Sequence, residues 1–343
     1  MRDAMRFAAI GLDHRHIYDL TEGLLDAGAT CAGYWPQTTD PRVLEGFRKR
    51  FPDVRPVEDR DALMRDPAID AIVSAAVPRD RAAIAIQAMR HGKDVLVDKP
   101  GVIAREALDE VRRVVNETGR IFSICFSERL ITPASEVAGK LVADGAIGRV
   151  IQTVGLGPHR FNRAIRPAWF FDPKLAGGIL ADIASHKIEQ FLFYTGSQTA
   201  EIVHSAIGKF GTEDFPEFQD FGEVVLRSDR ACGYLRVDWF TPDGLPTWGD
   251  GRFTILGTDG TIELRKNIDI EGRAGTDHLF MANHAGTRYI DCSNEPVSYF
   301  RRFIADVRDR TETAMTQEHV FTVCELALEA QARATRAVAR PAR

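Results

Sequence analysis

Short apolar runs alternate with amphipathic stretches over roughly the first 125 residues, a pattern typical of βαβ units. Ile17, Leu20 and Leu24 recur at helical spacing after the first run, and Gly28 follows where a helix would end. The predicted strands are 7–11, 30–35, 71–77, 95–97 and 121–126, with helices near 40–50, 80–90 and 108–118 between them. The run 71–77 has no polar interruption except Ser74, as expected for a central parallel strand that is buried on both faces.

The pattern changes near residue 127. After a helix at 133–144, strand-like alternation predominates, and residues 221–240 and 252–265 each predict a hairpin, the second turning at Asp259-Gly260. Amphipathic helices are predicted at 179–194, 295–309 and 316–338. We therefore expect an α/β domain with a parallel sheet over 1–127, and an α+β domain with a mostly antiparallel sheet over 128–343.

Composition agrees with two globular domains and excludes several classes of protein. The chain has 343 residues, of which 44% are hydrophobic and 27% charged. A net charge of −5 argues against nucleic acid or an anionic membrane as the main partner. The five cysteines are scattered without a CxxC pair, which predicts neither disulfides nor a zinc site. With no secretory signal or membrane-length apolar run, we expect a cytoplasmic protein that acts on a small molecule.

The first loop resembles a nucleotide-binding turn that has lost most of its glycines. In the G-x-G-x-x-G pattern, the three glycine positions are occupied by Gly11, Asp13 and His16. A carboxylate at the middle position repels phosphate unless it turns away or is paired, for example with Arg15. By itself this loop is better explained as a structural strand-to-helix corner.

The end of the second predicted strand does not decide between NAD and NADP. An acid that would bind the adenosine ribose is missing from residues 34–39, and the first one is Asp40. Thr38 and Thr39, with Arg42 nearby, could instead meet a 2′-phosphate, but such residues are common in polar loops.

Lys99 follows the strand 95–97, where open α/β sheets place their ligands. The chain has only eight lysines, against 36 arginines, so a lysine at this position is less easily explained as an ordinary surface cation. A lysine there could polarise a substrate oxygen. A solvated turn before a helix, with Pro100, explains the segment equally well.

The helix 179–194 carries Asp182 and His186 four residues apart, hence on one face. A carboxylate that hydrogen bonds to an imidazole raises its basicity, as a general base needs. Gly177-Gly178 just before it would allow close approach of a ligand. The alternative is an ordinary surface pair. A metal site of these two residues with His159 lacks any dense ligand motif, so we expect no metal.

Taken together and in order, these motifs resemble the Gfo/Idh/MocA oxidoreductases, which include glucose–fructose oxidoreductase and inositol dehydrogenases. The resemblance covers essentially the whole chain. It rests on Gly11, Asp98-Lys99-Pro100, Trp169 with Asp172, Gly177-Gly178 with Asp182 and His186, and the hairpin 255–264. The chain departs from the family at the glycine positions, at residues 78–82 and in having Asp98 where glutamate is commoner.

The resemblance implies a Rossmann dinucleotide-binding domain and hydride transfer between NAD or NADP and a CH–OH group of a sugar, polyol or related compound. Lys99 and His186 would act on the substrate hydroxyl, with Asp182 supporting the histidine. The implied cofactor-binding residues are Gly11, Leu12, Asp13, His14, Arg15, His16, Thr38, Ala76, Pro78, Asp98 and Lys99. The implied substrate-binding residues are Arg129, His159, Arg166, Trp169, Asp182 and His186.

Two alternatives remain open on the sequence. A non-catalytic ligand-binding or regulatory protein of the same fold would explain the lost glycines. A redox-neutral enzyme that recycles a bound NAD, for glycoside cleavage or epimerisation, would retain Lys99 and His186 as well. We also expect a homodimer or homotetramer, because the predicted antiparallel sheet would leave one face exposed.

Overall fold

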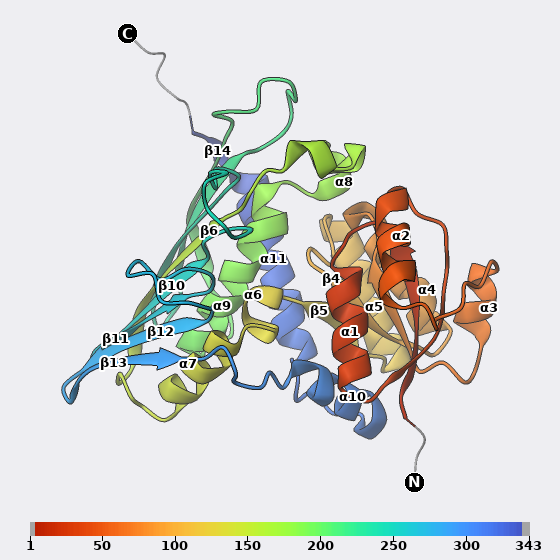
Figure 1. Cartoon of the computed structure of the whole chain (residues 1–343), viewed down its shortest axis with the longest axis horizontal. Helices are drawn as coiled ribbons and strands as arrows, with labels where there is room; N and C mark the ends of the chain where they lie inside the picture. Colours follow the sequence, from red (N-terminus) through yellow and green to blue (C-terminus); the bar gives the residue numbers. More distant parts are fainter. Residues whose placement is uncertain (1–3, 338–343) are drawn as a thin grey trace.

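A parallel sheet of five strands forms the core of the N-terminal domain in the computed structural model, which describes residues 4–337 (Figure 1). Its strands are β1 (Arg6–Leu12), β2 (Thr30–Tyr34), β3 (Ala71–Ala75), β4 (Asp94–Asp98) and β5 (Phe122–Cys125). They are ordered β2-β1-β3-β4-β5. Every residue of β3, β4 and β5 is buried, because helices cover both faces of the sheet.

The helices of this domain are α1 (Ile17–Asp26), α2 (Pro41–Arg50), α3 (Arg60–Arg65), α4 (Pro78–Arg90) and α5 (Arg105–Thr118). From β1 the chain crosses to β2 in one direction, and from β3 it crosses to β4 in the other. Right-handed crossovers therefore place α1 and α4 on opposite faces. The reversal between β1 and β3 opens a crevice at the carboxyl ends of these strands, where such sheets bind ligands.

The C-terminal domain is built on a nine-stranded, mostly antiparallel sheet in the order β13-β12-β11-β10-β6-β9-β8-β7-β14. Only the pairs β6–β9 and β7–β14 are parallel. The strands are β6 (Val150–Pro158), β7 (Glu201–Gly208), β8 (Phe221–Arg227), β9 (Cys232–Asp238), β10 (Arg252–Gly257), β11 (Gly260–Arg265), β12 (His278–Asn283), β13 (Gly286–Asp291) and β14 (Thr335–Arg336).

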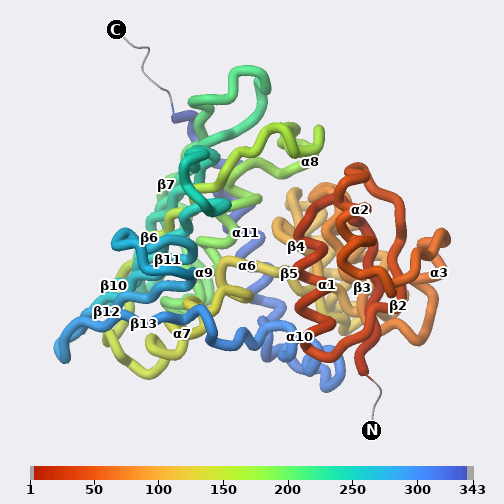
Figure 2. Tube along the Cα trace, viewed as in Figure 1, coloured from red at the N-terminus to blue at the C-terminus, as the bar shows by residue number. Residues whose placement is uncertain are grey.

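Helices cover one face of this sheet and face the N-terminal domain. The helices of this part of the chain are α6 (Ser127–Leu130), α7 (Pro133–Ala143), α8 (Pro173–Ala176), α9 (Ser185–Thr195), α10 (Tyr299–Asp309) and α11 (Gln317–Arg333), of which α7, α9 and α11 contact the sheet. Helix α11 contacts α9 and β7 on one side and α5 and β5 on the other. Figure 2 shows α10 returning to lie beneath α1, so late segments of the chain hold the two domains together. No helix covers the opposite face of the sheet in Figure 1.

The predicted fold class is confirmed: a parallel Rossmann sheet precedes a mixed, mostly antiparallel sheet. The two predicted hairpins are β8–β9 and β10–β11. The helix predicted at 179–194 begins instead as a π-helical turn, Leu180–Ala184. The last predicted helix ends at Arg333, and its expected final residue, 338, lies outside the described residues. We keep 1–127 and 128–343 as the proposed domains.

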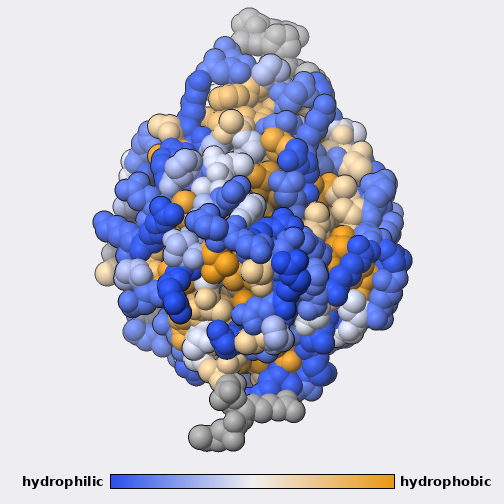
Figure 3. Space-filling view, turned by 90° about the vertical axis from the view of Figure 1, so that its right-hand side faces the viewer, coloured by the Kyte–Doolittle hydropathy of each residue, from blue (hydrophilic) through white to orange (hydrophobic). Residues whose placement is uncertain are grey.

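Two surface properties bear on function. None of the helices in the described part of the chain combines the length and apolarity needed to cross a bilayer. Viewed from the side of the N-terminal domain, the surface is mainly hydrophilic, with small hydrophobic areas scattered among polar residues (Figure 3).

Candidate active site

Lys99 is held at the carboxyl end of β4 by a buried arginine. Arg81, in the first turn of α4, is only 1% exposed. Its guanidinium donates hydrogen bonds to the backbone carbonyls of Ala76, Asp98, Lys99 and Pro100 and to the Asp98 carboxylate. One side chain thus fixes the turn from which Lys99 projects. The sequence pattern alone does not mark Arg81 for this role.

Two histidines of the first loop also contact the Asp98 carboxylate. His16 Nδ1 lies 2.8 Å from Asp98 Oδ1, and His14 Nδ1 lies 3.2 Å from Oδ2. Burial opposes ionisation of Asp98, but His16 and Arg81 outweigh it and hold the pKa of this carboxyl well below its usual range. Burial and the neighbouring His16 lower the pKa of His14 to about 3, so His14 is neutral.

The side chains of His14, His16 and Asp98 are of types that bind metal ions, and their ligand atoms lie within 4.8 Å of one another. Arg81, however, already supplies the positive charge at the Asp98 carboxylate, which lies 3.1 Å from its guanidinium. The cluster is therefore explained by ion pairing and hydrogen bonding alone.

Asp182 and His186 reach the same pocket from the C-terminal domain. Gly177 and Gly178 precede them with φ of +94° and +84°, a conformation that favours glycine. The amides of Ile179 and Leu180 donate to the side-chain oxygens of Gln219 and Gln331, which satisfy the start of the π-helical turn.

The expected hydrogen bond between Asp182 and His186 is not present. Instead, Lys99 Nζ donates to Asp182 Oδ1 at 2.7 Å. The spacing of four residues brings side chains together in an α-helix, whereas Asp182 lies in a π-helical turn with different geometry. Nδ1 of His186 is buried without a hydrogen-bond partner among the residues that the structure describes.

The protonation states of this pair follow from their surroundings. Burial opposes ionisation of Asp182, but Lys99 prevails and lowers the pKa of the carboxyl, so Asp182 is ionised. Burial, with Lys99 nearby, lowers the pKa of His186 well below its usual value, so the imidazole is neutral. The pocket therefore holds a cation–carboxylate pair beside an imidazole that can accept a proton.

The loop after β6 forms the opposite wall. His159 Nδ1 lies 3.0 Å from the Gly157 carbonyl oxygen. Because a carbonyl only accepts, Nδ1 carries the proton and Nε2 offers a lone pair. Burial lowers the pKa of His159 to about 4, which keeps it neutral. Arg166 and Trp169 line the pocket beside it.

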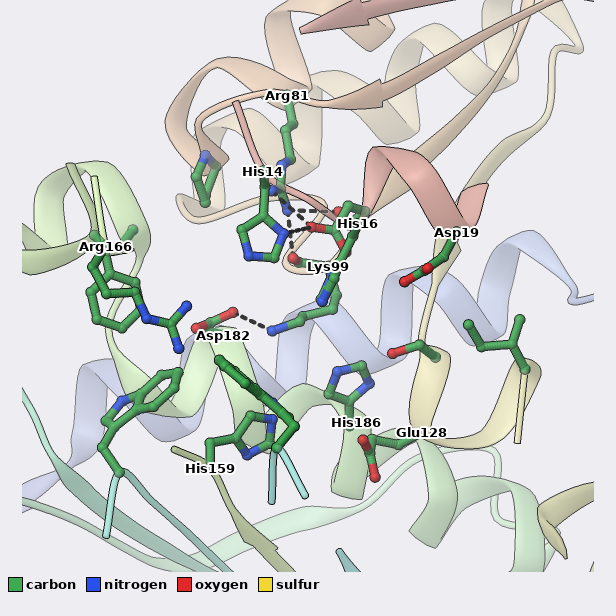
Figure 4. Close-up of a pocket in the computed structure, with 18 of the residues that line it drawn as sticks. His14, His16, Asp19, Arg81, Lys99, Glu128, His159, Arg166, Asp182 and His186 are labelled. Carbon is green, nitrogen blue, oxygen red and sulfur yellow. Dashed lines mark hydrogen bonds and ion pairs between the residues drawn. The ribbon is translucent and has the colours of Figure 1, made fainter. Parts of the chain in front are cut away.

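Together these groups enclose a cavity of about 150 Å³ between the two domains (Figure 4). Several of its lining residues carry no motif that marks them in the sequence: Asp19, Arg81, Glu128, Trp239, Trp248 and Lys266. Glu128 binds Lys266 at 2.8 Å, an ion pair between segments far apart in sequence. Arg129, a predicted substrate residue, points elsewhere and pairs with Glu189. Arg15 lies over the Trp248 ring, outside the set of residues that line the cavity.

A second cavity, of about 460 Å³, lies at the crevice between β1 and β3. It is lined by Gly11, Asp13, Thr38 and Ala76, all predicted cofactor residues, together with Trp35, Gln37, Thr39, Arg60, Val77, Asp80, Ala83, Ile84 and Gln87. Gly11 has φ +82°, and a Cβ there would lie 2.5 Å from Ala76 Cβ. The first glycine of the motif is thus required by the close packing of β1 against the end of β3.

Asp13 is paired, as the sequence analysis required, but not with Arg15. Its Oδ1 accepts hydrogen bonds from the Thr39 amide at 2.5 Å and the Thr39 hydroxyl at 2.7 Å. The Thr38 hydroxyl contacts the same oxygen at 3.2 Å and donates to the Leu12 carbonyl at 2.6 Å. These bonds tie the carboxylate to the loop after β2.

Two of the four backbone amides at residues 13–16 are already bonded within the fold. The amides of Asp13 and His14 both donate to the Ala75 carbonyl. Those of Arg15 and His16 have no hydrogen-bond partner within residues 4–337. An anion at the start of α1 would therefore be met by residues 15 and 16 rather than by the whole loop.

Comparisons with known proteins agree with this arrangement. Residues 39–126 match the model of an oxidoreductase family with an NAD-binding Rossmann fold, and residues 136–263 match that of the GFO/IDH/MocA C-terminal domain. A crystal structure from Erwinia carotovora atroseptica SCRI1043, of a protein named only as an oxidoreductase, is 44% identical. It superposes with a TM-score of 0.93 over 97% of this chain and 100% of that one.

More distant relatives have named substrates. The scyllo-inositol 2-dehydrogenase (NAD(+)) of Bacillus subtilis (strain 168) is 26% identical over 273 residues, which cover 76% of this chain and 74% of that protein. A levoglucosan dehydrogenase in complex with NADH and levoglucosan has a TM-score of 0.78. Its identity is 18%, over 96% of this chain and 98% of that one, so it shows the shared fold alone.

Proposed function

This chain belongs to the Gfo/Idh/MocA family of oxidoreductases, and from that premise we propose that it transfers hydride between NAD or NADP and a CH–OH group of a small hydroxy compound. The observation that carries the proposal is the meeting of Lys99, Asp182 and a neutral His186 in one pocket between the domains. The sugar and inositol substrates of the relatives make a sugar, polyol or related compound the first choice.

The N-terminal crevice suits a dinucleotide. The cavity of about 460 Å³ is large enough for an adenosine moiety. Asp13, the acid that would repel phosphate, is held by Thr38 and Thr39, while the amides of Arg15 and His16 are open to an anion. Gly11, Thr38 and Ala76 would then border the adenosine end, and His14, His16, Pro78, Asp98 and Lys99 the end next to the pocket. Arg15 would contribute its amide.

The pocket residues divide the proton chemistry between them. A bound nicotinamide supplies the acceptor or donor of hydride. Lys99 uses one Nζ hydrogen on Asp182 and keeps the others for a substrate oxygen, where it stabilises negative charge as the hydroxyl is deprotonated. His186, neutral and buried, accepts that proton in the direction of oxidation and returns it in the direction of reduction.

Titration of the purified protein with NADH and NADPH, followed by fluorescence, tests whether it binds a nicotinamide cofactor. A panel of sugars, polyols and sugar acids with the oxidised cofactors then tests whether it oxidises a CH–OH group. We expect one cofactor to bind and at least one class of substrate to yield reduced nicotinamide. Absence of binding by both cofactors would overturn the proposal in favour of a non-catalytic protein, and product release without net cofactor reduction would indicate the redox-neutral alternative.

A further inference from the structure

Arg166 has surroundings unlike those of the other cations in the pocket. Its guanidinium lies over three aromatic rings, 4.3 Å from the centroid of Phe170 and 4.8 Å from those of Trp239 and Trp248. Nε donates to the Phe161 carbonyl at 2.9 Å, and Nη2 approaches the Arg160 carbonyl at 3.2 Å. These neutral contacts fix the orientation of the guanidinium without supplying a negative charge.

Each other cation that lines the pocket has a carboxylate partner. Arg81 pairs with Asp98, Lys99 with Asp182, and Lys266 with Glu128, at 3.1, 2.7 and 2.8 Å. Arg166 forms no salt bridge across the described residues. In Figure 4 its guanidinium points into the pocket toward Asp182, but that carboxylate is already bound by Lys99. Lys99 and Arg166 therefore face a single carboxylate at this end of the pocket, and the ion pair is made by Lys99.

The other end of the pocket has the opposite character. Asp19, an exposed residue of α1, lines the pocket on the side away from Arg166 (Figure 4). It has no ion-pair partner among residues 4–337. An anionic group on a ligand would thus be attracted to the Arg166 end and repelled from the α1 end.

A guanidinium that is largely removed from water without a counter-ion is costly, and burial lowers the pKa of Arg166 to about 10. The aromatic contacts offset part of that cost. A carboxylate ligand would complete the compensation, because its two oxygens match the fork of guanidinium N–H groups. Neutral hydroxyl groups would leave the charge uncompensated.

We therefore propose that the substrate is a hydroxy acid whose carboxylate binds Arg166 while its hydroxyl group meets Lys99 and His186. This inference rests on the proposed function and narrows it from any polyol to sugar acids and related anions. In the oxidation, hydride leaves the C–H bond for the nicotinamide, the O–H proton passes to His186, and a C=O bond forms. The carboxylate takes no part in bond making. Nε2 of His159 accepts a hydrogen bond from a second hydroxyl.

Matched substrates test this inference directly. Steady-state kinetics of the NAD(P)-loaded enzyme would compare D-glucuronate with D-glucose and D-gluconate with D-sorbitol, and binding to the NAD(P)H complex would be measured by calorimetry. Wild type is expected to favour the acid of each pair at least about tenfold. Arg166→Gln should lower kcat/KM for the acid by about 100-fold, mainly through KM, and by less than about threefold for the neutral partner.

Controls separate charge recognition from loop structure. Arg163→Gln changes an exposed arginine of the same loop and should leave both substrates unaffected. Arg166→Lys keeps the charge without the fork and should restore part of the preference for the acid. Thermal unfolding of each variant shows whether the protein still folds. If Arg166→Gln does not fold, Arg166→Lys takes its place in the comparison. Its kcat/KM is expected to fall at least fivefold for the acid and to stay unchanged for the neutral partner.

Several results would overturn the inference. Wild type that fails to discriminate within the pairs, whether both members react or neither binds, contradicts it. Weaker binding of NADH or NADPH by Arg166→Gln would assign Arg166 to a cofactor phosphate instead. Unchanged kinetics of Arg166→Gln on the acids would refute only this inference, whereas absence of cofactor binding in wild type would refute the proposed function itself.

Discussion

Lys99 Nζ donates a hydrogen bond to Asp182 Oδ1 at 2.7 Å, across the boundary between the two domains. Lys99 follows β4 of the parallel sheet, and Asp182 lies in the π-helical turn before α9. The Lys99 side chain is 7% exposed, so the pair holds its geometry with little access to bulk water. Asp182 thus orients the lysine, and in the proposed reaction His186 is left to exchange the proton.

Loss of the Lys99 ammonium should abolish most turnover without abolishing cofactor binding. In Lys99→Met, the substrate oxygen loses its stabilising cation, and kcat should fall by about 10²–10³-fold. Fluorescence titration with NAD(P)H should show a Kd within about threefold of wild type. Lys174→Met, at an exposed lysine of α8, is the matched control and should keep full activity. Equal activity of the two variants would remove Lys99 from the mechanism.

Acid should destabilise the protein from about pH 6.5 downward because His186 is buried and neutral. The unfolded chain binds a proton at its ordinary pKa of about 6.5, whereas the folded chain binds it only far below that. The contribution of His186 to the free energy of unfolding is therefore fully present above about pH 6.5. Below that pH it falls by roughly 1.4 kcal/mol per pH unit. Urea unfolding near pH 7.5 and pH 5.5 measures the slope.

The slope should be shallower in His186→Asn, which has no group to protonate. His284→Asn, at a side chain that is 86% exposed, should keep the wild-type slope. An identical pH dependence in all three proteins would show that His186 is not held neutral by the fold.

Gly11 should tolerate no side chain. In Gly11→Ala the new Cβ would meet Ala76 Cβ at 2.5 Å while φ is +82°, so overpacking adds to backbone strain. We expect a loss of about 2–4 kcal/mol in unfolding free energy. Gly28→Ala has a similar φ of +94° but no atom within 4 Å, and should lose only about 1 kcal/mol. Chemical denaturation compares them, and equal losses would mean that strain alone matters at Gly11.

Asp13 should weaken cofactor binding only when it is released from its partners. Thr39→Val removes the hydroxyl donor at 2.7 Å, loosens the hold on the carboxylate near the phosphates, and should raise the NAD(P)H Kd by roughly tenfold. Asp13→Asn removes the charge and keeps an acceptor for the Thr39 amide, so its Kd should equal or fall below that of wild type. Weaker binding in Asp13→Asn would show that this charge assists the cofactor.

The fold was predictable where burial dictates the residue pattern. The strand β3 is apolar except for Ser74 because helices cover both faces, and β8–β9 and β10–β11 alternate because only one face is buried. The strands β12 and β13 were missed: all six residues of β13 are at least partly exposed, so no buried face marks it in the sequence.

The residues that were assigned catalytic roles meet in one pocket, but much of the pocket lining and the pairings could not be predicted. Lys99 and His186 could be found from strand ends and helical spacing. The π-helical turn, which places Asp182 where it accepts a hydrogen bond from Lys99, leaves no periodic signal in the sequence. Arg81 resembles any arginine of an exposed helix turn, because its partners lie up to 19 residues away along the chain. Lys266 and Glu128 meet only through the tertiary fold.

Transfer of deuterium tests the central claim most directly. The best substrate of the panel, deuterated at the carbon that bears the reacting hydroxyl, would be incubated with the protein and the preferred oxidised cofactor. Mass spectrometry of the reduced nicotinamide should show one deuterium gained from the substrate, at a rate that falls at least about 100-fold in Lys99→Met. Deuterium that appears in water or stays in the product, with no labelled reduced cofactor, would contradict the account.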